Sequence, residues 1–222
     1  MFIELDQLSV EKRNLLLCIV FLGVLIYFGC YAFGFWRGAG YWELLLPGSY
    51  ALSLAFVIPN FRPSALQLWT APEQGFLYWA KITTIIACIL SAVIALFIGL
   101  YGFALGHPIF PDMAYQFGSA QFIFWLKYAC IRAPIIEELI FRWMLCPIFL
   151  TKWGKWPTIF CSGALFASVH VAYGNPSIDN FLAGYFLAWA FVKSKSIWVP
   201  IVLHALGNLC VGLIFLGLTF FN

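Results

Sequence analysis

Two adjacent glutamates lie within an apolar stretch of this chain. Glu137 and Glu138 are followed one helical turn later by Arg142, and most of the residues around them are apolar. A carboxylate in hydrocarbon costs several kcal/mol unless it is paired, protonated or facing a wet cavity, and neighbouring carboxylates repel each other. The chain holds only 9 acidic residues in 222. The doublet therefore marks a candidate functional site.

Helix geometry separates the two glutamates. Positions four apart share a helix face, so Glu138 and Arg142 are predicted to form an ion pair. Glu137 turns about 100° away and is left to project elsewhere. Pro134 precedes the doublet. It removes a backbone donor and can kink or start a helix there.

Two more polar islands lie in apolar stretches. One holds His170, and the other holds His204 with Asn208 one turn later. A lone membrane His or Asn often only hydrogen-bonds to a neighbouring helix, but three islands together favour a site. A carboxylate beside a His can deprotonate water, and a His and an Asn one turn apart can donate to a developing oxyanion. Equally, Glu, His and His could hold a catalytic zinc with an open position for water.

Other chemistries lack their signatures. The chain has neither the H-E-x-x-H metalloprotease motif nor a G-x-S-x-G nucleophile elbow. Its 7 cysteines stand alone in apolar stretches, which is typical of small buried hydrophobes rather than of a disulfide framework or thiolate metal site. The net charge of +3 is small and scattered, so a nucleic-acid partner is not expected.

The elements that must position these residues are predicted to be transmembrane helices. The chain is 64% hydrophobic and 9% charged, against roughly 25% charged residues in a soluble domain, and its mean hydropathy is +0.94. We expect an all-α polytopic bundle of about seven spans, with six to eight possible, forming a single integral membrane domain over residues 1–222.

The candidate spans are residues 15–35, about 41–59, 76–105, 118–147, 156–172, 177–192 and 197–221, with a loop or interfacial turn at 60–75. Seven spans put most basic loop residues on one side, with Arg37 the main exception. By the positive-inside tendency the N-terminus is cytoplasmic. The basic residues on that side are Lys12, Arg13, Arg62, Lys152, Lys155, Lys193 and Lys195.

The three polar islands, in this order, resemble the motifs of the CPBP family of intramembrane proteases, also called Abi, which includes the type II CAAX prenyl endopeptidases. The matching patterns are Glu137-Glu138-x-x-x-Arg142, Phe166-x-x-x-His170 and His204-x-x-x-Asn208. The resemblance covers residues 124–211, a motif-bearing catalytic core. Each motif alone is weak, whereas all three in order within apolar segments are specific.

The resemblance implies a site in a cavity within the membrane. Glu137 would activate water with His170 as its partner, His204 and Asn208 would stabilise the oxyanion, and Glu138 and Arg142 would support the site. Family members are described both as metalloproteases and as metal-independent glutamic proteases. The glutamic mechanism, with no cofactor, is preferred because Asn208 suits oxyanion binding better than metal ligation. Under the zinc alternative, the ligands would be Glu137, His170 and His204.

The leading hypothesis is an intramembrane endopeptidase that cleaves a membrane-associated protein or peptide near its membrane-embedded or C-terminal end. The short length favours a prokaryotic cytoplasmic membrane. The competing hypotheses are a zinc-dependent protease using the same residues, and a non-enzymatic membrane immunity or transport protein, since intramembrane Glu, His and Arg also build proton relays. The substrate and the oligomeric state stay open.

Overall fold

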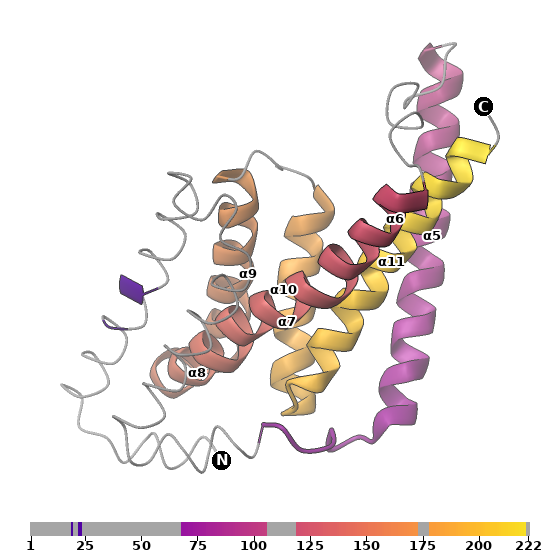
Figure 1. Cartoon of the computed structure of the whole chain (residues 1–222). Coiled ribbons are helices and arrows are strands. Elements are labelled where there is room, and N and C mark those ends of the chain that lie inside the picture. Colours follow the sequence, from indigo (N-terminus) through magenta and orange to yellow (C-terminus); the bar gives the residue numbers. More distant parts are fainter. Residues whose placement is uncertain (1–18, 20–21, 24–67, 106–118, 173–177, 221–222) are drawn as a thin grey trace. The chain divides into compact units, whose positions relative to one another are not determined.

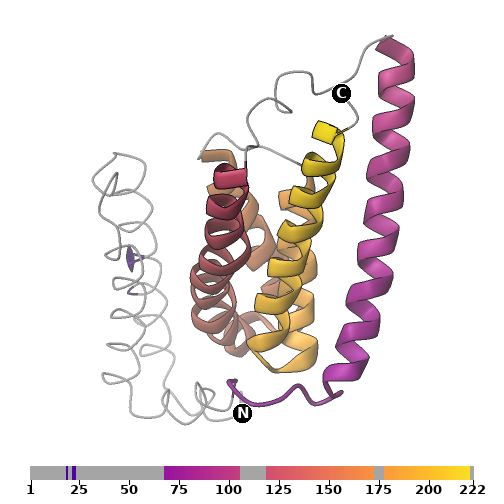
Figure 2. The ribbon, with the colours of Figure 1, turned by 45° about the vertical axis from the view of Figure 1, so that its right-hand side comes forward.

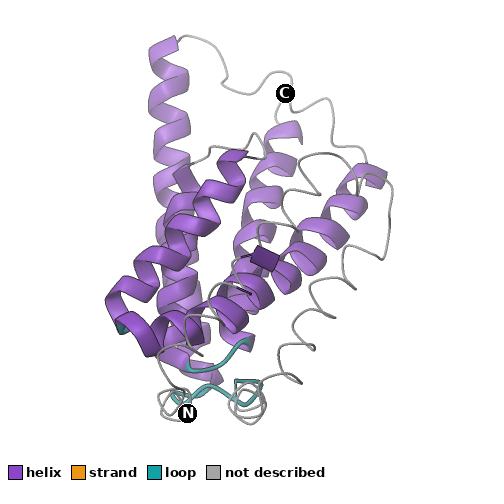
Figure 3. Ribbon diagram, turned by 90° about the vertical axis from the view of Figure 1, so that its left-hand side faces the viewer, coloured by secondary structure: helices purple, strands orange, loops and turns teal. Residues whose placement is uncertain are grey.

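The computed structural model describes residues 19, 22–23, 68–105, 119–172 and 178–220. Within these residues the secondary structure is helical with short loops and contains no strand (Figure 3). The predicted all-α class is confirmed for this part of the chain. The predicted spans 15–35 and about 41–59 lie, except for residues 19, 22 and 23, outside the described residues.

Several predicted segments match observed helices closely (Figure 1). α5 occupies Phe76–Leu105, as expected, and α9 (Lys155–Ala172), α10 (Ile178–Ser194) and α11 (Trp198–Phe220) begin and end within two residues of their predicted bounds. None of the helices in the described ranges combines the length and apolarity needed to cross a membrane. The seven-span arrangement stays a prediction.

The segment that carries the glutamates is one uninterrupted helical run, longer than the predicted 118–147. It comprises α6 (Ser119–Trp125), the π-helical segment η2 (Leu126–Arg132), α7 (Ala133–Glu138), a second π-helical segment η3 (Leu139–Leu145) and α8 (Cys146–Trp153). The predicted end at Pro147 was wrong, because the helix passes through this proline instead of stopping at it.

Prolines explain where the π-helical segments lie. Pro134 and Pro147 each follow the last residue of a π-helical segment by two positions. A proline inside an α-helix lacks the N–H donor, and its ring clashes with the carbonyl four residues earlier. A local π-helical turn widens the backbone and relieves this clash, and such turns are frequent at functional sites. The glutamate doublet therefore lies on a short α-helix between two widened segments.

The chain divides into two compact units. The first contains residues 1–73 and 135–201, and the second contains residues 74–134 and 202–222. Glu137, Glu138, Arg142 and His170 fall in the first unit. His204 and Asn208 fall in the second. The predicted single domain stays a prediction.

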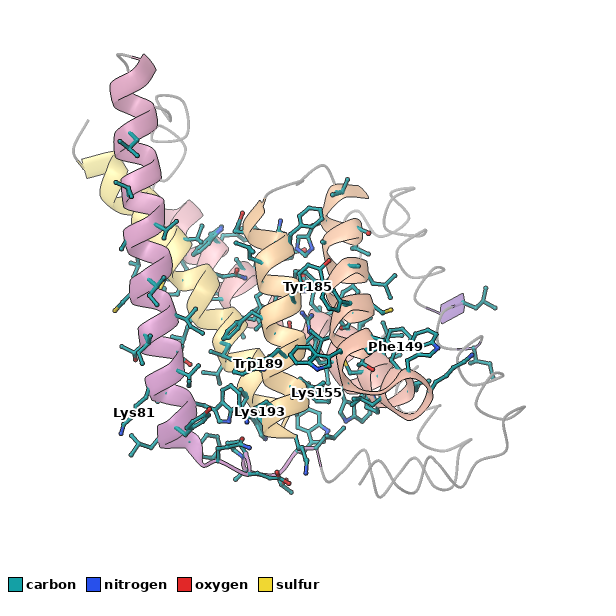
Figure 4. All side chains as sticks on the ribbon, turned by 180° about the vertical axis from the view of Figure 1, so that it is seen from behind. Lys81, Phe149, Lys155, Tyr185, Trp189 and Lys193 are labelled. Atoms are coloured by element: carbon teal, nitrogen blue, oxygen red, sulfur yellow. The ribbon has the colours of Figure 1, made fainter. Side chains whose placement is uncertain are left out.

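In the first unit, η3 and α8 pack with α9 and α10 around an apolar core (Figures 1 and 2). α9 and α10 come very close together at two glycines. A Cβ on Gly184 would lie 2.8 Å from the Gly163 carbonyl oxygen, and a Cβ on Gly163 would overlap the Tyr185 ring, which Figure 4 labels on α10. Small residues permit such close helix approach. The core residues are Leu68, Ile136, Ile140, Phe141, Trp143, Met144, Leu145, Cys146, Ile148, Phe149, Phe166, Phe191, Ile197 and Ile201.

Residues 68–73 form a brace across the turn between α10 and α11, consistent with the predicted loop or turn at 60–75. The Ile197 N–H donates to the Leu68 carbonyl at 2.8 Å, and the Trp198 indole N–H donates to the Trp69 carbonyl at 3.0 Å. The Trp69 ring also packs edge-on against Trp143 of η3, with centroids 6.3 Å apart. Residues 68–73 therefore contact both η3 and the start of α11.

Candidate active site

Glu138 and Arg142 form the ion pair that their spacing predicts. Arg142 Nε lies 3.1 Å from Glu138 Oε2, and both side chains are 0% exposed. The guanidinium also donates from Nη2 to the Gly184 carbonyl at 2.9 Å and lies over the Phe166 ring at 4.6 Å. A buried ion needs this combination of opposite charge and hydrogen bonds to offset its lost hydration.

These contacts connect three helices at one point. Arg142 belongs to η3, Phe166 to α9 and Gly184 to α10. Because Arg142 touches all three and Glu138 lies one turn before it, the pair fixes the rotation of the glutamate-bearing helix. The orientation of Glu137, the residue before Glu138, follows from that rotation.

Glu137 points away from this buried pair and toward His170. Glu137 Oε2 lies 3.9 Å from His170 Nε2, and the two side chains are 25% and 17% exposed. The doublet thus divides into a fully buried member and a partly open one. The partly exposed glutamate lies beside an imidazole contributed by another helix, 33 residues further along the chain, and the oxygen that faces the imidazole, Oε2, is itself buried.

The tautomer of His170 follows from its backbone contact. Nδ1 lies 2.9 Å from the Phe166 carbonyl oxygen. A carbonyl oxygen only accepts, so Nδ1 must carry the hydrogen. In the neutral ring, Nε2 is then a lone-pair acceptor directed at Glu137. The Phe166 ring packs against the imidazole, with centroids 4.4 Å apart, and this limits rotation of the ring.

The separation of 3.9 Å between Glu137 and His170 is too long for a direct hydrogen bond. A water at about 2.8 Å from both atoms would subtend an angle of roughly 90°, which is a comfortable geometry for one water with two partners. Two zinc bonds of about 2.0–2.1 Å across the same gap would need an angle of roughly 145°, far from tetrahedral. The pair as placed fits a shared water better than a shared zinc.

The predicted zinc ligands are Glu137, His170 and His204. Within the described residues no group of three or more His, Cys, Asp or Glu side chains could hold a metal ion. Glu137 and His170 lie together in the first unit, whereas His204 belongs to the second. The three-ligand zinc site of the alternative stays a prediction.

His204 and Asn208 lie one turn apart on α11, as predicted. His204 is buried. Asn208 is half-buried, and its Nδ2 donates to the Ala129 carbonyl of η2 at 2.6 Å. These contacts belong to the second unit. The role of both residues in oxyanion binding stays a prediction.

Sequence reasoning missed three residues that support the site. Gly184 supplies the carbonyl that accepts from Arg142, and Ser162 of α9 donates from Oγ to the Phe141 carbonyl at 3.0 Å. Cys146 Sγ also donates to this carbonyl, at 3.3 Å. Glycines inside apolar helices could have signalled close helix contact around Gly184. Ser162 carried no comparable signal, because a single serine in an apolar helix commonly bonds within its own helix.

Comparison with known proteins supports the motif resemblance. Residues 119–210 match the family model described as Rce1-like, type II CAAX prenyl endopeptidase Rce1-like. The matched range includes all six candidate site residues. No curated protein matches the chain, and no solved structure does.

Proposed function

On the premise that residues 119–210 form an Rce1-like domain, we propose that this chain is an intramembrane endopeptidase in which Glu137 is the general base and His170 its partner. The matched family is a protease family, and the match supports this general class of activity. The assignment of these residues, the substrate and the metal-independent mechanism are our proposal.

The proposal rests on the different burial and partners of the two glutamates. Glu138 is committed to Arg142 at 3.1 Å with both side chains fully buried, so it is a poor candidate for contact with substrate. Glu137 is partly open and faces His170 across 3.9 Å. A general base must reach the proton of its water directly, and Glu137 is the member of the doublet that can do so.

In the proposed reaction, one water lies between Glu137 and His170. Its oxygen attacks the peptide carbonyl carbon while one of its protons passes to the Glu137 carboxylate. His170 Nε2 accepts a hydrogen bond from the other O–H and holds the water in line. The tetrahedral oxyanion then collapses, the C–N bond breaks, and Glu137 returns the proton to the leaving amine. This sequence conserves atoms and protons without an added cofactor.

Oxyanion stabilisation is assigned to donors on α11. His204 is buried on this helix, where a hydrogen bond to developing charge is stronger than in water. Asn208, one turn later, is the second donor implied by the family resemblance. Loss of a single oxyanion donor typically lowers kcat by about 100- to 1,000-fold.

We propose a location in a prokaryotic cytoplasmic membrane, with a membrane-associated protein or peptide as substrate. The apolar composition supports the location. The membrane location is also supported by the end of the α9–α10 pair where Lys155 and Lys193 lie (Figure 4). Exposed Trp153 and Trp156 are close to this end, with Lys155 Nζ 5.2 Å from the Trp156 ring. Aromatic and basic residues together are typical of a cytoplasmic membrane interface.

The test uses the full chain reconstituted in lipid vesicles, a peptide ending in a farnesylated CAAX sequence, and the same peptide without the lipid. Mass spectrometry of the products locates the cleaved bond. We expect wild-type protein to cleave the lipidated peptide and Glu137→Gln to be about 100- to 10,000-fold slower.

Glu73→Gln is the matched control, since Glu73 pairs with Lys195 at the surface and its loss should leave turnover unchanged. Wild-type turnover by Glu137→Gln would contradict the mechanism. Cleavage of the unmodified peptide at the same rate as the farnesylated one would show that the lipid is not recognised.

A further inference from the structure

The π-helical segment before the glutamates has an interrupted hydrogen-bond ladder. In η2 each N–H pairs with the carbonyl five residues earlier, and the Ala133 N–H accordingly donates to the Tyr128 carbonyl. The next bond in this register would run from residue 134 to the Ala129 carbonyl. Residue 134 is a proline and has no N–H to donate.

The Ala129 carbonyl is therefore left without its helical donor. Its α-helical donor would be the Ala133 N–H, which is directed at Tyr128 instead. Ala129 is half-buried, and a carbonyl removed from water without a hydrogen-bond partner destabilises the folded state. A donor from outside the local backbone has to provide a hydrogen bond to the Ala129 carbonyl.

Asn208 supplies the missing donor from α11. Its Nδ2 lies 2.6 Å from the Ala129 carbonyl oxygen. Because a carbonyl can only accept, this contact fixes the amide orientation, with the NH2 group toward Ala129 and Oδ1 directed away. Asn208, Ala129 and Pro134 all belong to the second unit, so the three parts of this arrangement are placed together.

We infer that Asn208 is a positioning residue that replaces the backbone donor removed by Pro134 and so holds the π-helical turn from which α7 leads to Glu137. α7 begins at Ala133, and Glu137 is three residues beyond the proline. A shift of the widened turn would rotate the start of α7 and displace the carboxylate. One amide hydrogen of Asn208 is committed to Ala129, which leaves only the other for any contact with substrate.

This inference refines the proposed function, because the link to catalysis rests on Glu137 being the base. The hydrogen bond to Ala129 and its dependence on Pro134 do not rest on it. A measurement of stability therefore tests the replacement of the donor even if Glu137 has no catalytic role.

The experiment is a double-mutant cycle between Asn208→Ala and Pro134→Ala in the 222-residue chain. Pro134→Ala restores an N–H that can reach the Ala129 carbonyl. We expect Asn208→Ala to lower the apparent unfolding midpoint by roughly 2–10 °C in the wild-type background. It should have almost no effect in the Pro134→Ala background. Peptide cleavage should fall further on Asn208→Ala in the wild-type background than in the Pro134→Ala background, where only the proposed contact with the oxyanion is lost.

Two controls keep the cycle interpretable. Ser162→Ala removes a side-chain bond to a different carbonyl, that of Phe141, so its effect should be equal in both backgrounds. Pro134→Leu also restores the N–H and serves as a second background if Pro134→Ala does not fold.

An equal loss of midpoint in both backgrounds would overturn the inference, as would the absence of any shift on Asn208→Ala. An equal loss of cleavage in both backgrounds with an unchanged midpoint would also overturn it, since that pattern limits Asn208 to direct contact with the oxyanion.

Discussion

The two glutamates of the doublet are expected to respond in opposite ways to the same isosteric change. Glu138→Gln removes one charge of a pair whose members are both fully buried and lie 3.1 Å apart. Removing one partner of such a pair typically costs about 3–5 kcal/mol, because it leaves the other charge uncompensated. The lower end applies here, since Arg142 keeps its bond to the Gly184 carbonyl at 2.9 Å. Glutamine can also still accept through its remaining oxygen.

Glu137→Gln should leave stability almost unchanged. The side chain is 25% exposed, and its contact with His170 is 3.9 Å long. Changes at such open positions are usually worth less than about 0.5 kcal/mol. Its effect should appear in catalysis instead, as loss of the base.

The assay is thermal unfolding followed by intrinsic tryptophan fluorescence in one detergent, with peptide cleavage measured in parallel. For a chain of this size about 3 kcal/mol corresponds to a lower midpoint by roughly 6–12 °C. We expect that shift for Glu138→Gln and little or none for Glu137→Gln. The double variant Glu138→Leu/Arg142→Met removes both charges and should be more stable than Glu138→Gln.

Equal midpoints for the two single variants would refute the reasoning. So would a larger loss of stability for Glu137→Gln than for Glu138→Gln, because it would place the buried ion pair on the other glutamate.

Three further predictions follow from the same contacts. Gly184→Ala should destabilise the protein by about 1–3 kcal/mol, because its Cβ would meet the Gly163 carbonyl oxygen at 2.8 Å. Gly207→Ala, with nothing within 4 Å of its Cβ, should instead be neutral or stabilising by up to about 1 kcal/mol. Chemical denaturation of both variants measures the difference. His170→Asn can still donate to the Phe166 carbonyl but loses Nε2, so cleavage should fall about 100-fold or more while the unfolding midpoint changes little; retained activity would argue against His170 as the partner of Glu137. Dialysis against a chelator should leave cleavage unchanged, and lost activity that zinc restores would instead support the metalloprotease alternative.

Contacts within one helix and the bounds of several helices could be predicted from residue spacing alone. The pairing of Glu138 with Arg142 follows from the helical repeat. In the structure both side chains of this pair are fully buried. The bounds of α5, α9, α10 and α11 follow from apolar runs ended by polar, glycine and proline residues. These features depend on residues within one or two helical turns, where the covalent chain itself sets the distance.

The helix through residues 119–153 shows where local reading failed. The apolar segment was predicted to end at residue 147. The helix instead continues to Trp153 through two π-helical segments. Side chains from α9 and α11 donate to carbonyls near the two prolines, from Ser162 and Asn208. Those donors are distant in sequence, so no local pattern reveals them.

By itself, the sequence determined the helical class, the candidate residues and the separation of Glu137 from Glu138. Tertiary packing decided what each of these residues contacts. The close approach of α9 and α10 at Gly163 and Gly184 brings a carbonyl to Arg142, and the position of α9 brings His170 within 3.9 Å of Glu137. Contacts between segments tens of residues apart depend on how whole helix faces fit together. Spacing along one helix therefore identifies which residues share a face, and only packing shows which partner that face meets.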